Sequence, residues 1–187
     1  MNAKHAISKK HFKSKKAIAN YEDMISYIVE KIGIVEKEIK SLIESEPEFR
    51  QTFANILSIP GVGKVLGFHL ITMTNGFTEH LDSKKLSSYL GIVPLPRQSG
   101  TSLRLRNSSS GIGHSKFRKV IYMASMSSIL SNKELKKYYQ RKVAEGKNKK
   151  LVLNNIANKI IKIIIAIIKS NKPYLPNFVS INPIFKK

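Results

Sequence analysis

An apolar repeat near the start of the chain constrains its fold more than any other feature of the sequence. Between residues 21 and 42 the apolar side chains recur in alternating steps of four and three. The positions are Tyr21, Ile25, Ile28, Ile32, Val35, Ile39 and Leu42. Sustained over about three heptads, this spacing is typical of the seam of a coiled coil. We therefore expect a coiled-coil helix over residues 20–47 that joins copies of the chain into a homo-oligomer through residues 21–42. A helix packed within its own chain is the alternative.

The charge of the sequence indicates a polyanionic partner. Its 187 residues include 33 Lys and Arg against 12 Asp and Glu, a formal net charge of +21. An excess of this size points to DNA, RNA or an acidic membrane. Only six of the basic residues are arginine, and four of them (Arg97, Arg104, Arg106 and Arg118) bracket one serine-rich stretch. Because the chain has no cysteine, disulfides and thiolate chemistry are excluded.

The remaining pattern is mainly helical. Helices are expected over residues 48–57, 84–90, 116–130, 134–145 and 151–170, whereas strand signal is limited to residues 102–106. The predicted class is mainly α: an N-terminal coiled-coil helix, then a helical domain with a helix-hairpin-helix and a short β-like serine/arginine segment. The predicted divisions are a basic arm over 1–19, the coiled-coil helix over 20–47, the helical domain over 48–176 and a tail over 177–187.

The last predicted helix is the most apolar segment of the chain. Its core face is expected to hold Val152, Ile156, Ile160, Ile163 and Ile167. Three asparagines and two lysines interrupt it, so no membrane span is expected, and docking on a membrane surface is the weakest alternative. The first twenty residues are basic but lack an apolar core, so they predict no signal peptide. Nothing suggests export, and we expect a cytoplasmic protein without a membrane partner.

A short glycine motif predicts contact with a DNA backbone. Ile59, Pro60, Gly61, Val62 and Gly63 precede an apolar helix that begins near Lys64. The pattern resembles the helix-hairpin-helix modules of many DNA-binding proteins. In such modules the glycines let backbone N–H groups at the start of the second helix approach a phosphate. A turn between two helices without DNA contact is the alternative.

Ser99 is the best candidate for a nucleophile. It precedes Gly100 among the arginines, in a stretch without carboxylates from Asp82 to Glu134. Arginine forks bind phosphate at two points, and a serine oxygen could attack phosphorus. The serine proton would have to pass to His114 or to a group outside the chain. On the residues alone, a Ser/Gly turn in a basic loop is the commoner explanation.

A metal site is not expected in this chain. After Arg50 the carboxylates are scattered: Glu79, Asp82, Glu134 and Glu145. The five histidines lack the spacing of metal ligands. Metal-dependent nucleases need clustered carboxylates to hold Mg²⁺. A complete two-metal site is therefore improbable on the sequence.

Several short motifs follow one another in a distinctive order. They are Ile59-Pro60-Gly61-Val62-Gly63, Tyr89-Leu90-Gly91-Ile92-Val93-Pro94, Ser99-Gly100-Thr101-Ser102, Lys116-Phe117-Arg118-Lys119 with Tyr122-Met123-Ala124, and the late Lys149-Lys150 helix. Over roughly residues 50 to 176, this order resembles the C-terminal half of the insertion-sequence-110 (also 116 and 902) type transposases.

The resemblance implies specific roles for the chain. Ser99 would be the DNA nucleophile, with Ser102 as the fallback if the register is shifted, and cleavage would pass through a phosphoserine intermediate. It also implies a structured guide RNA from the element itself. The residues expected to bind DNA are Gly61, Gly63, Lys64, Arg97, Arg104, Arg106, Arg118 and Lys119.

The sequence also departs from that family. The family's other half is a resolvase-like domain whose acidic residues bind Mg²⁺, and no such half precedes the coiled coil here. We therefore expect no cofactor on this chain, Mg²⁺ only together with a resolvase-like domain, and nucleic-acid binding without recombination by the chain alone. Residues 113–116 and Phe117 also differ from the family pattern. The alternative function is a non-catalytic nucleic-acid-binding protein in which Ser99 is only a turn.

Overall fold

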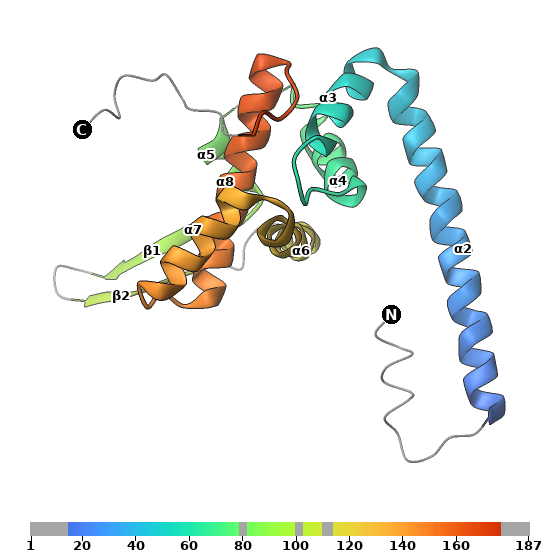
Figure 1. Ribbon diagram of the computed structural model, residues 1–187, viewed down its shortest axis with the longest axis horizontal. Coiled ribbons are helices and arrows are strands. Elements are labelled where there is room, and N and C mark those ends of the chain that lie inside the picture. Colours follow the sequence, from blue (N-terminus) through green and yellow to red (C-terminus); the bar gives the residue numbers. More distant parts are fainter. Residues whose placement is uncertain (1–14, 79–81, 100–102, 110–113, 177–187) are drawn as a thin grey trace. The chain divides into compact units, whose positions relative to one another are not determined.

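The computed structural model describes residues 15–78, 82–99, 103–109 and 114–176, and it is mainly helical, as predicted (Figure 1). The helices are α2 (Lys15–Ser45), α3 (Pro47–Leu57), α4 (Lys64–Thr74), α5 (Ser83–Tyr89), α6 (Ser115–Ser131), α7 (Lys133–Ala144) and α8 (Lys149–Ser170); the strands are β1 (Pro94–Ser99) and β2 (Leu103–Ser109). The chain divides into two compact units between Glu46 and Pro47. Most of the predicted arm and all of the predicted tail lie outside the described residues.

Helix α2 is the described part of the first unit. It begins at Lys15, so residues 15–19, predicted in the arm, belong to the helix. The apolar seam is open in the single chain, since Ile28, Ile32 and Val35 are each about half exposed (49%, 52% and 51%). The polar side carries helix-surface charge pairs such as Lys40 with Glu44, 3.4 Å apart. The helix is as expected, and the coiled coil itself stays a prediction.

Helix α8 is the centre of the second unit. Helices α3, α5, α6 and α7 pack against it, and α4 packs on α3 and α6. Val152, Ile156 and Ile160 are fully buried at helical spacing. Burying one such side chain contributes roughly 1.5–3 kcal/mol. The predicted core face is wrong at Ile163, which is half-buried, while Ile164 is fully buried. Because several helices surround α8, more than one stripe of it is covered.

By length and composition alone, α8 could also cross a membrane. Eight of its residues are buried within the second unit, including the four named above. A helix whose apolar face is covered by other helices has the pattern of a core helix. Its composition therefore needs no membrane to explain it.

Helices α3 and α4 are joined by the turn at residues 58–63. Phe53 of α3 stacks on Phe68 of α4, with ring centroids 5.1 Å apart and planes 3° from parallel. Gly67 allows this contact, because a Cβ there would lie 2.7 Å from the Phe53 ring. The helix pair is therefore held by close aromatic packing rather than by the turn alone.

Strands β1 and β2 form an antiparallel hairpin between α5 and α6. The pairs are Pro94 with Ser109, Leu95 with Ser108, Arg97 with Leu105, Gln98 with Arg104 and Ser99 with Leu103, and the register shifts between Leu95 and Arg97. The sequence pattern predicted part of β2 only. Strand β1 lies outside the predicted strand signal, and it contains Pro94 and Pro96, which lack the backbone N–H of a strand residue. In a two-stranded sheet each strand has one unpaired side, where the missing proline N–H costs nothing.

After α8 the chain returns to the start of the second unit. Asn171 adopts a left-handed conformation (φ +49°) and its side-chain oxygen accepts a hydrogen bond from Asn55 Nδ2 at 3.1 Å. The backbone N–H of Tyr174 donates to Ser58 Oγ at 2.7 Å. The Tyr174 hydroxyl accepts from Asn132 Nδ2 at 2.9 Å. We call this set of bonds the C-terminal clasp.

Candidate nucleic-acid interface

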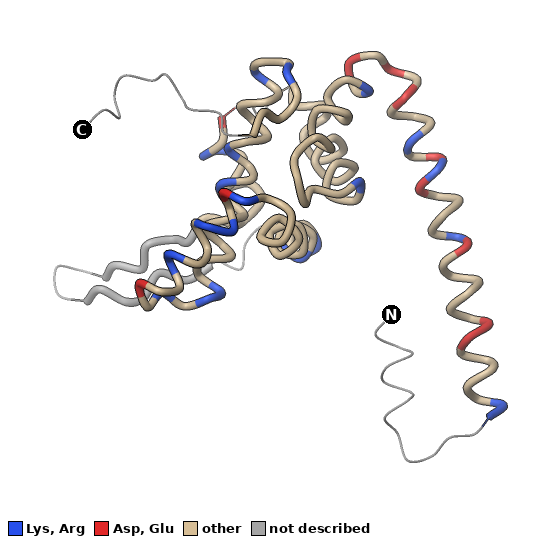
Figure 2. The backbone as a smooth tube through the Cα atoms, viewed as in Figure 1, with Lys and Arg blue, Asp and Glu red and all other residues tan. Residues whose placement is uncertain are grey.

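Positive charge is concentrated in the second unit. Residues 47–187 contain 24 Lys and Arg against five Asp and Glu, whereas residues 1–46 are nearly balanced at nine against seven. Figure 2 shows acidic residues spread along α2, with Lys and Arg dominating the described helices of the second unit. A polyanion is therefore attracted to the second unit far more than to α2.

Ser99 lies at the tip of the hairpin. It is the last residue of β1, and its pairing with Leu103 closes the described ladder. Alternation along the strands places position 97 on the same face as position 99, and positions 104 and 106 on the other. The backbone thus brings Arg97 and Arg104 to the same end of the hairpin as Ser99. The fallback Ser102 lies outside the described residues.

We call the end of the hairpin where Pro94 pairs with Ser109 its root. Arg118 and Lys119 follow this end in the sequence. They follow Ser115 in the first turns of α6, and Phe117 between them and the helix start is fully buried, which anchors this end. A six-residue strand is roughly 20 Å long, so the root and the tip meet different parts of a ligand. The structure therefore divides the predicted arginine cluster between the two ends of the hairpin.

Ring and amide contacts fix the root. The Tyr89 ring at the end of α5 lies against the His114 ring before α6, with centroids 5.2 Å apart. Asn158 Nδ2 on α8 donates to the Ile92 carbonyl oxygen at 3.5 Å, just before β1. His114, the predicted proton acceptor for Ser99, is thus engaged at the opposite end of the hairpin.

In the turn between α3 and α4, Gly61 has a packing role. Its φ is +88°, and a Cβ at this position would press on the Cα and N of Ser128 and lie 2.6 Å from its Oγ. Ser128 is fully buried in α6, and its Oγ has no hydrogen-bond partner among the described residues. Close approach of the turn to α6 therefore explains this glycine without any DNA.

Gly63 and Lys64 are placed as a phosphate-binding turn requires. Gly63 is the N-cap of α4, with φ −100° and ψ 169°, and no side chain caps the helix. Both residues are exposed, and nothing lies within 4 Å of where a Gly63 Cβ would be. The start of an eleven-residue helix without a side-chain cap can offer its N–H groups to an anion.

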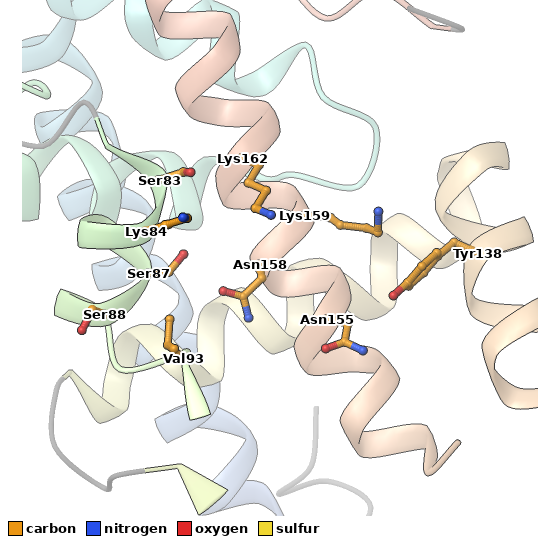
Figure 3. A pocket seen from close by; sticks show the side chains of 10 residues that line it. All are labelled: Ser83, Lys84, Ser87, Ser88, Val93, Tyr138, Asn155, Asn158, Lys159 and Lys162. Carbon is orange, nitrogen blue, oxygen red and sulfur yellow. The ribbon is translucent and has the colours of Figure 1, made fainter. Parts of the chain in front are cut away.

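A pocket that the sequence did not reveal crosses α8 near the root of the hairpin (Figure 3). Its volume is about 540 Å³. Lys84 and Ser87 line it from α5, Asn158 and Lys162 from α8, and Tyr138 from α7. Ser87 and Asn158 point into it from opposite sides in Figure 3. The available signal is the polar spacing of Asn155, Asn158, Lys159 and Lys162 in an otherwise apolar helix.

No group of three acidic, histidine or cysteine residues that could hold a metal ion occurs within the described part of the chain. Asp82 accepts hydrogen bonds from the backbone N–H groups of Lys84 (2.7 Å) and Lys85 (3.0 Å), which lower the pKa of its carboxyl. Glu145 accepts one from Lys142 Nζ at 2.6 Å, which lowers its pKa. These carboxylates serve helix ends, so the described residues do not fit an Mg²⁺ site.

Comparison with known families finds a similarity over the middle of the chain. Residues 54–140 match the family described as Transposase IS116/IS110/IS902 family. This stretch of the chain is similar to the transposases of that family. It includes the turn before α4, the whole hairpin and α6.

Curated relatives are similar along most of the chain. The pilin gene-inverting proteins of Moraxella lacunata and Moraxella bovis are each 29% identical over 154 residues, which cover 82% of this chain and 48% of theirs. The insertion element IS116 uncharacterized 44.8 kDa protein of Streptomyces clavuligerus is 25% identical over 139 residues, covering 71% of this chain and 35% of its own. The chain spans about half the length of the first two relatives, and less of the third.

Proposed function

We propose that this chain supplies the nucleophile for DNA strand cleavage and exchange in transposition, and that the nucleophile is the hydroxyl of Ser99. The observation that carries the proposal is the transposase-family match over residues 54–140, which includes the hairpin that ends at Ser99. The relatives named as gene-inverting proteins support rearrangement of DNA as the reaction class.

The proposed step is an attack on phosphorus. The Ser99 oxygen forms a bond to the phosphorus of a phosphodiester, and the bond to one nucleotide oxygen breaks. The serine proton leaves to a base, and the departing oxygen takes up a proton. Arg97, which shares a face of the hairpin with Ser99, would stabilise the charge that grows on the phosphoryl oxygens, and Arg104 on the other face would hold a neighbouring phosphate. Because His114 is engaged at the root, the base comes from outside the hairpin.

The other DNA contacts follow from exposed positions of the second unit. Gly63 and Lys64 would hold one backbone phosphate at the start of α4. Arg106, Arg118 and Lys119 would hold phosphates nearer the root of the hairpin. Gly61 would act indirectly, by keeping the turn against α6. Phosphate contacts of this kind position a duplex without reading its sequence.

Cleavage is also proposed to need a resolvase-like partner segment that carries the Mg²⁺ ligands. Support comes from the described carboxylates, which form no cluster of three, and from Asp82 and Glu145, which are engaged at helix ends. No cofactor is assigned to this chain, and none of its residues is given a metal-dependent step. A structured guide RNA, implied by the family resemblance, would be the second nucleic-acid partner.

Self-association is proposed through α2, with a second copy of the chain as the occupant of its apolar seam. The seam repeats for about three heptads and is exposed in the single chain, and sustained heptads favour a like partner. The nearly balanced charge of residues 1–46 does not oppose this pairing, unlike the charge of the second unit.

A covalent trap tests the nucleophile. The chain is incubated with DNA from the ends of its element, with and without a supplied resolvase-like segment and Mg²⁺, and adducts are resolved on a denaturing gel. We expect an adduct only when the segment is present, and mass spectrometry should place the phosphate on Ser99. Ser99→Ala should abolish the adduct, whereas Ser102→Ala should retain it. An adduct that survives Ser99→Ala would exclude this serine, and an adduct formed by the chain alone would exclude the need for a partner.

A non-catalytic nucleic-acid-binding protein is the second candidate. It is favoured by the placement of His114 away from Ser99 and by the scattered carboxylates of the described residues. It predicts steeply salt-dependent binding, no adduct under any condition, and the same affinity for Ser99→Ala as for the native chain.

A further inference from the structure

The pocket across α8 is polar where the rest of the helix is apolar. Asn155, Asn158, Lys159 and Lys162 follow one another at helical spacing on one face, and all four line the pocket. Burying polar groups costs free energy unless they are paired. Asn158 is used by the fold, since its amide donates to Ile92 and Asn154. Lys159 contacts the ring of Tyr138, while Lys84 and Lys162 line the pocket from α5 and α8.

The electrostatics of the pocket favour an anion. No acidic residue lines it among the described residues, while Lys84, Lys159 and Lys162 do. Burial and the neighbouring charges of Lys162 and Arg141 lower the pKa of Lys159. Its Nζ lies 4.4 Å from the centroid of the Tyr138 ring, which partly replaces lost water. Asp82, at the start of α5, is already engaged in capping that helix. A bound anion would relieve the repulsion among these lysines.

The dimensions point to more than a simple ion. A volume of about 540 Å³ falls in the range of small-molecule and cofactor sites. Lysine ammonium groups suit a phosphate, while serine hydroxyls and asparagine amides suit the sugar and the base edges. Tyr138 adds an aromatic ring to the rim. Together these groups fit a phosphate-bearing nucleotide.

We propose that this pocket binds one nucleotide of a nucleic-acid strand, with its phosphate held by Lys84 and Lys162. The inference rests on the proposed function for the presence of the strand and adds a second place where the strand is held. Val93 lines the pocket immediately before β1. Strand β1 then runs roughly 20 Å to Ser99, so the pocket and the serine meet different phosphates. The pocket is therefore a positioning site and takes no part in the bond change.

Affinity measurements distinguish binding in the pocket from non-specific attraction to the positive charge of the second unit. A fluorescein-labelled 20-nucleotide single-stranded DNA is titrated with the full chain, and anisotropy is recorded from low to high salt. Lys84→Ala with Lys162→Ala should weaken binding roughly tenfold or more and lower the salt slope by about 0.7, the value for one neutralised phosphate of a single strand. The matched control, Lys169→Ala with Lys172→Ala, removes the same charge from exposed positions that do not line the pocket. It should weaken binding less than threefold.

A second variant keeps every charge and fills the space. Ser88 is exposed on α5 and lines the pocket, so Ser88→Trp should narrow it without unfolding the helix. Binding of the same oligonucleotide should fall at least fivefold. Ala144→Trp, at an exposed position of α7 outside the pocket lining, should leave it unchanged. Competition with inorganic phosphate and with mononucleotides distinguishes a small-anion site from a strand site, and the proposal requires the oligonucleotide to bind more tightly than either.

The outcomes also separate this inference from the proposed function. If the native chain binds the oligonucleotide and the pocket variants match their controls, the pocket proposal is wrong while the proposed function stands. If the native chain does not bind nucleic acid, both are wrong. Mononucleotides that bind as tightly as the oligonucleotide would also overturn the strand assignment.

Discussion

Gly61 and Gly63 lie two positions apart in one turn under different constraints. At Gly61 a positive φ and the backbone of Ser128 both exclude a side chain. At Gly63 the backbone is extended and the space around a Cβ is open. The glycine motif in the sequence predicts phosphate contact for both residues. The structure supplies a packing reason for the first, and leaves the second exposed at the start of α4.

Gly61→Ala should therefore lower the free energy of unfolding by about 2–4 kcal/mol, from backbone strain and overpacking against α6. Gly63→Ala is the matched control and should change it by less than about 1 kcal/mol. Urea unfolding followed by circular dichroism measures both. Equal unfolding midpoints for the two variants would contradict the packing role.

The pKa of Lys159 on α8 responds to burial and to the positive charges around it. Its pKa is lowered first by burial and then by Lys162 and Arg141. The folded protein therefore releases this proton at lower pH than the unfolded chain, and stability rises as the pH passes from the folded pKa toward the ordinary lysine value. Lys162→Ala should raise the pKa of Lys159 and narrow that pH window.

An NMR titration of the lysine side-chain carbons would follow this change directly. Lys169→Ala is the control, because Lys169 does not contribute to the shift of Lys159, and it should leave the titration in place. A Lys159 pKa that stays the same in Lys162→Ala would mean that Lys162 contributes nothing to the shift.

At the scale of the element, α2 and the hairpin differ in how well the sequence predicts them. The seam of α2 has a heptad repeat and α8 has a 3.6-residue apolar period, and the predicted ends of the helices lie within about five residues of the observed ones. Asp82 caps α5, and aspartate is among the residue types that favour this position. Strand β1 was not predicted, since Pro94 and Pro96 lack backbone N–H groups and only the pairing with β2 makes the strand possible.

Ile32→Lys tests the seam of α2. If a second copy covers the seam, each copy loses one buried isoleucine, roughly 1.5–3 kcal/mol, and the dimer loses twice that. The dissociation constant should then rise at least a hundredfold in analytical ultracentrifugation. Val29→Lys makes the same change at a position that is exposed but off the seam, and it should leave the dimer intact. A native chain that sediments as a monomer at all concentrations would remove the self-association proposal.

For the whole molecule, the C-terminal clasp connects parts of the second unit that are distant in sequence. Residues 171–174 bond to α3, to the turn after it and to the residue between α6 and α7. Asn132 also accepts hydrogen bonds from the N–H groups of Glu134 and Leu135, so one side chain both caps α7 and holds the clasp. Buried networks in which each member is bonded fix one arrangement of their elements.

Tyr174→Phe should lower the free energy of unfolding by about 1 kcal/mol, because Asn132 Nδ2 loses its acceptor. Leu175→Ala, at an exposed neighbouring position, should stay within about 0.5 kcal/mol of the native chain. Thermal unfolding of the two variants measures both changes. Equal stability of Tyr174→Phe and the native chain would mean that the hydrogen bonds of the C-terminal clasp do not stabilise the fold.

The candidate site was only partly predictable from sequence. Ser99 and its arginines could be named because they are neighbours in the chain. Their division between the tip and the root of the hairpin needed the register and the place of α6. The pocket could not be predicted, since α5, α7 and α8 supply its walls from positions far apart in sequence. Lys84 and Lys162 have no sequence pattern in common.

The uneven charge of the two units has a consequence for handling the protein. Because the second unit has 24 basic residues, we expect the protein to be purified from cells with host nucleic acid bound to it. That nucleic acid should dissociate only at high salt concentration. The chain has no Trp and seven Tyr, so its own absorbance at 280 nm is weak and a small contaminant dominates the spectrum. The ratio of absorbance at 260 and 280 nm is therefore measured before and after a high-salt wash. It shows whether the second unit is free of host nucleic acid when a binding titration begins.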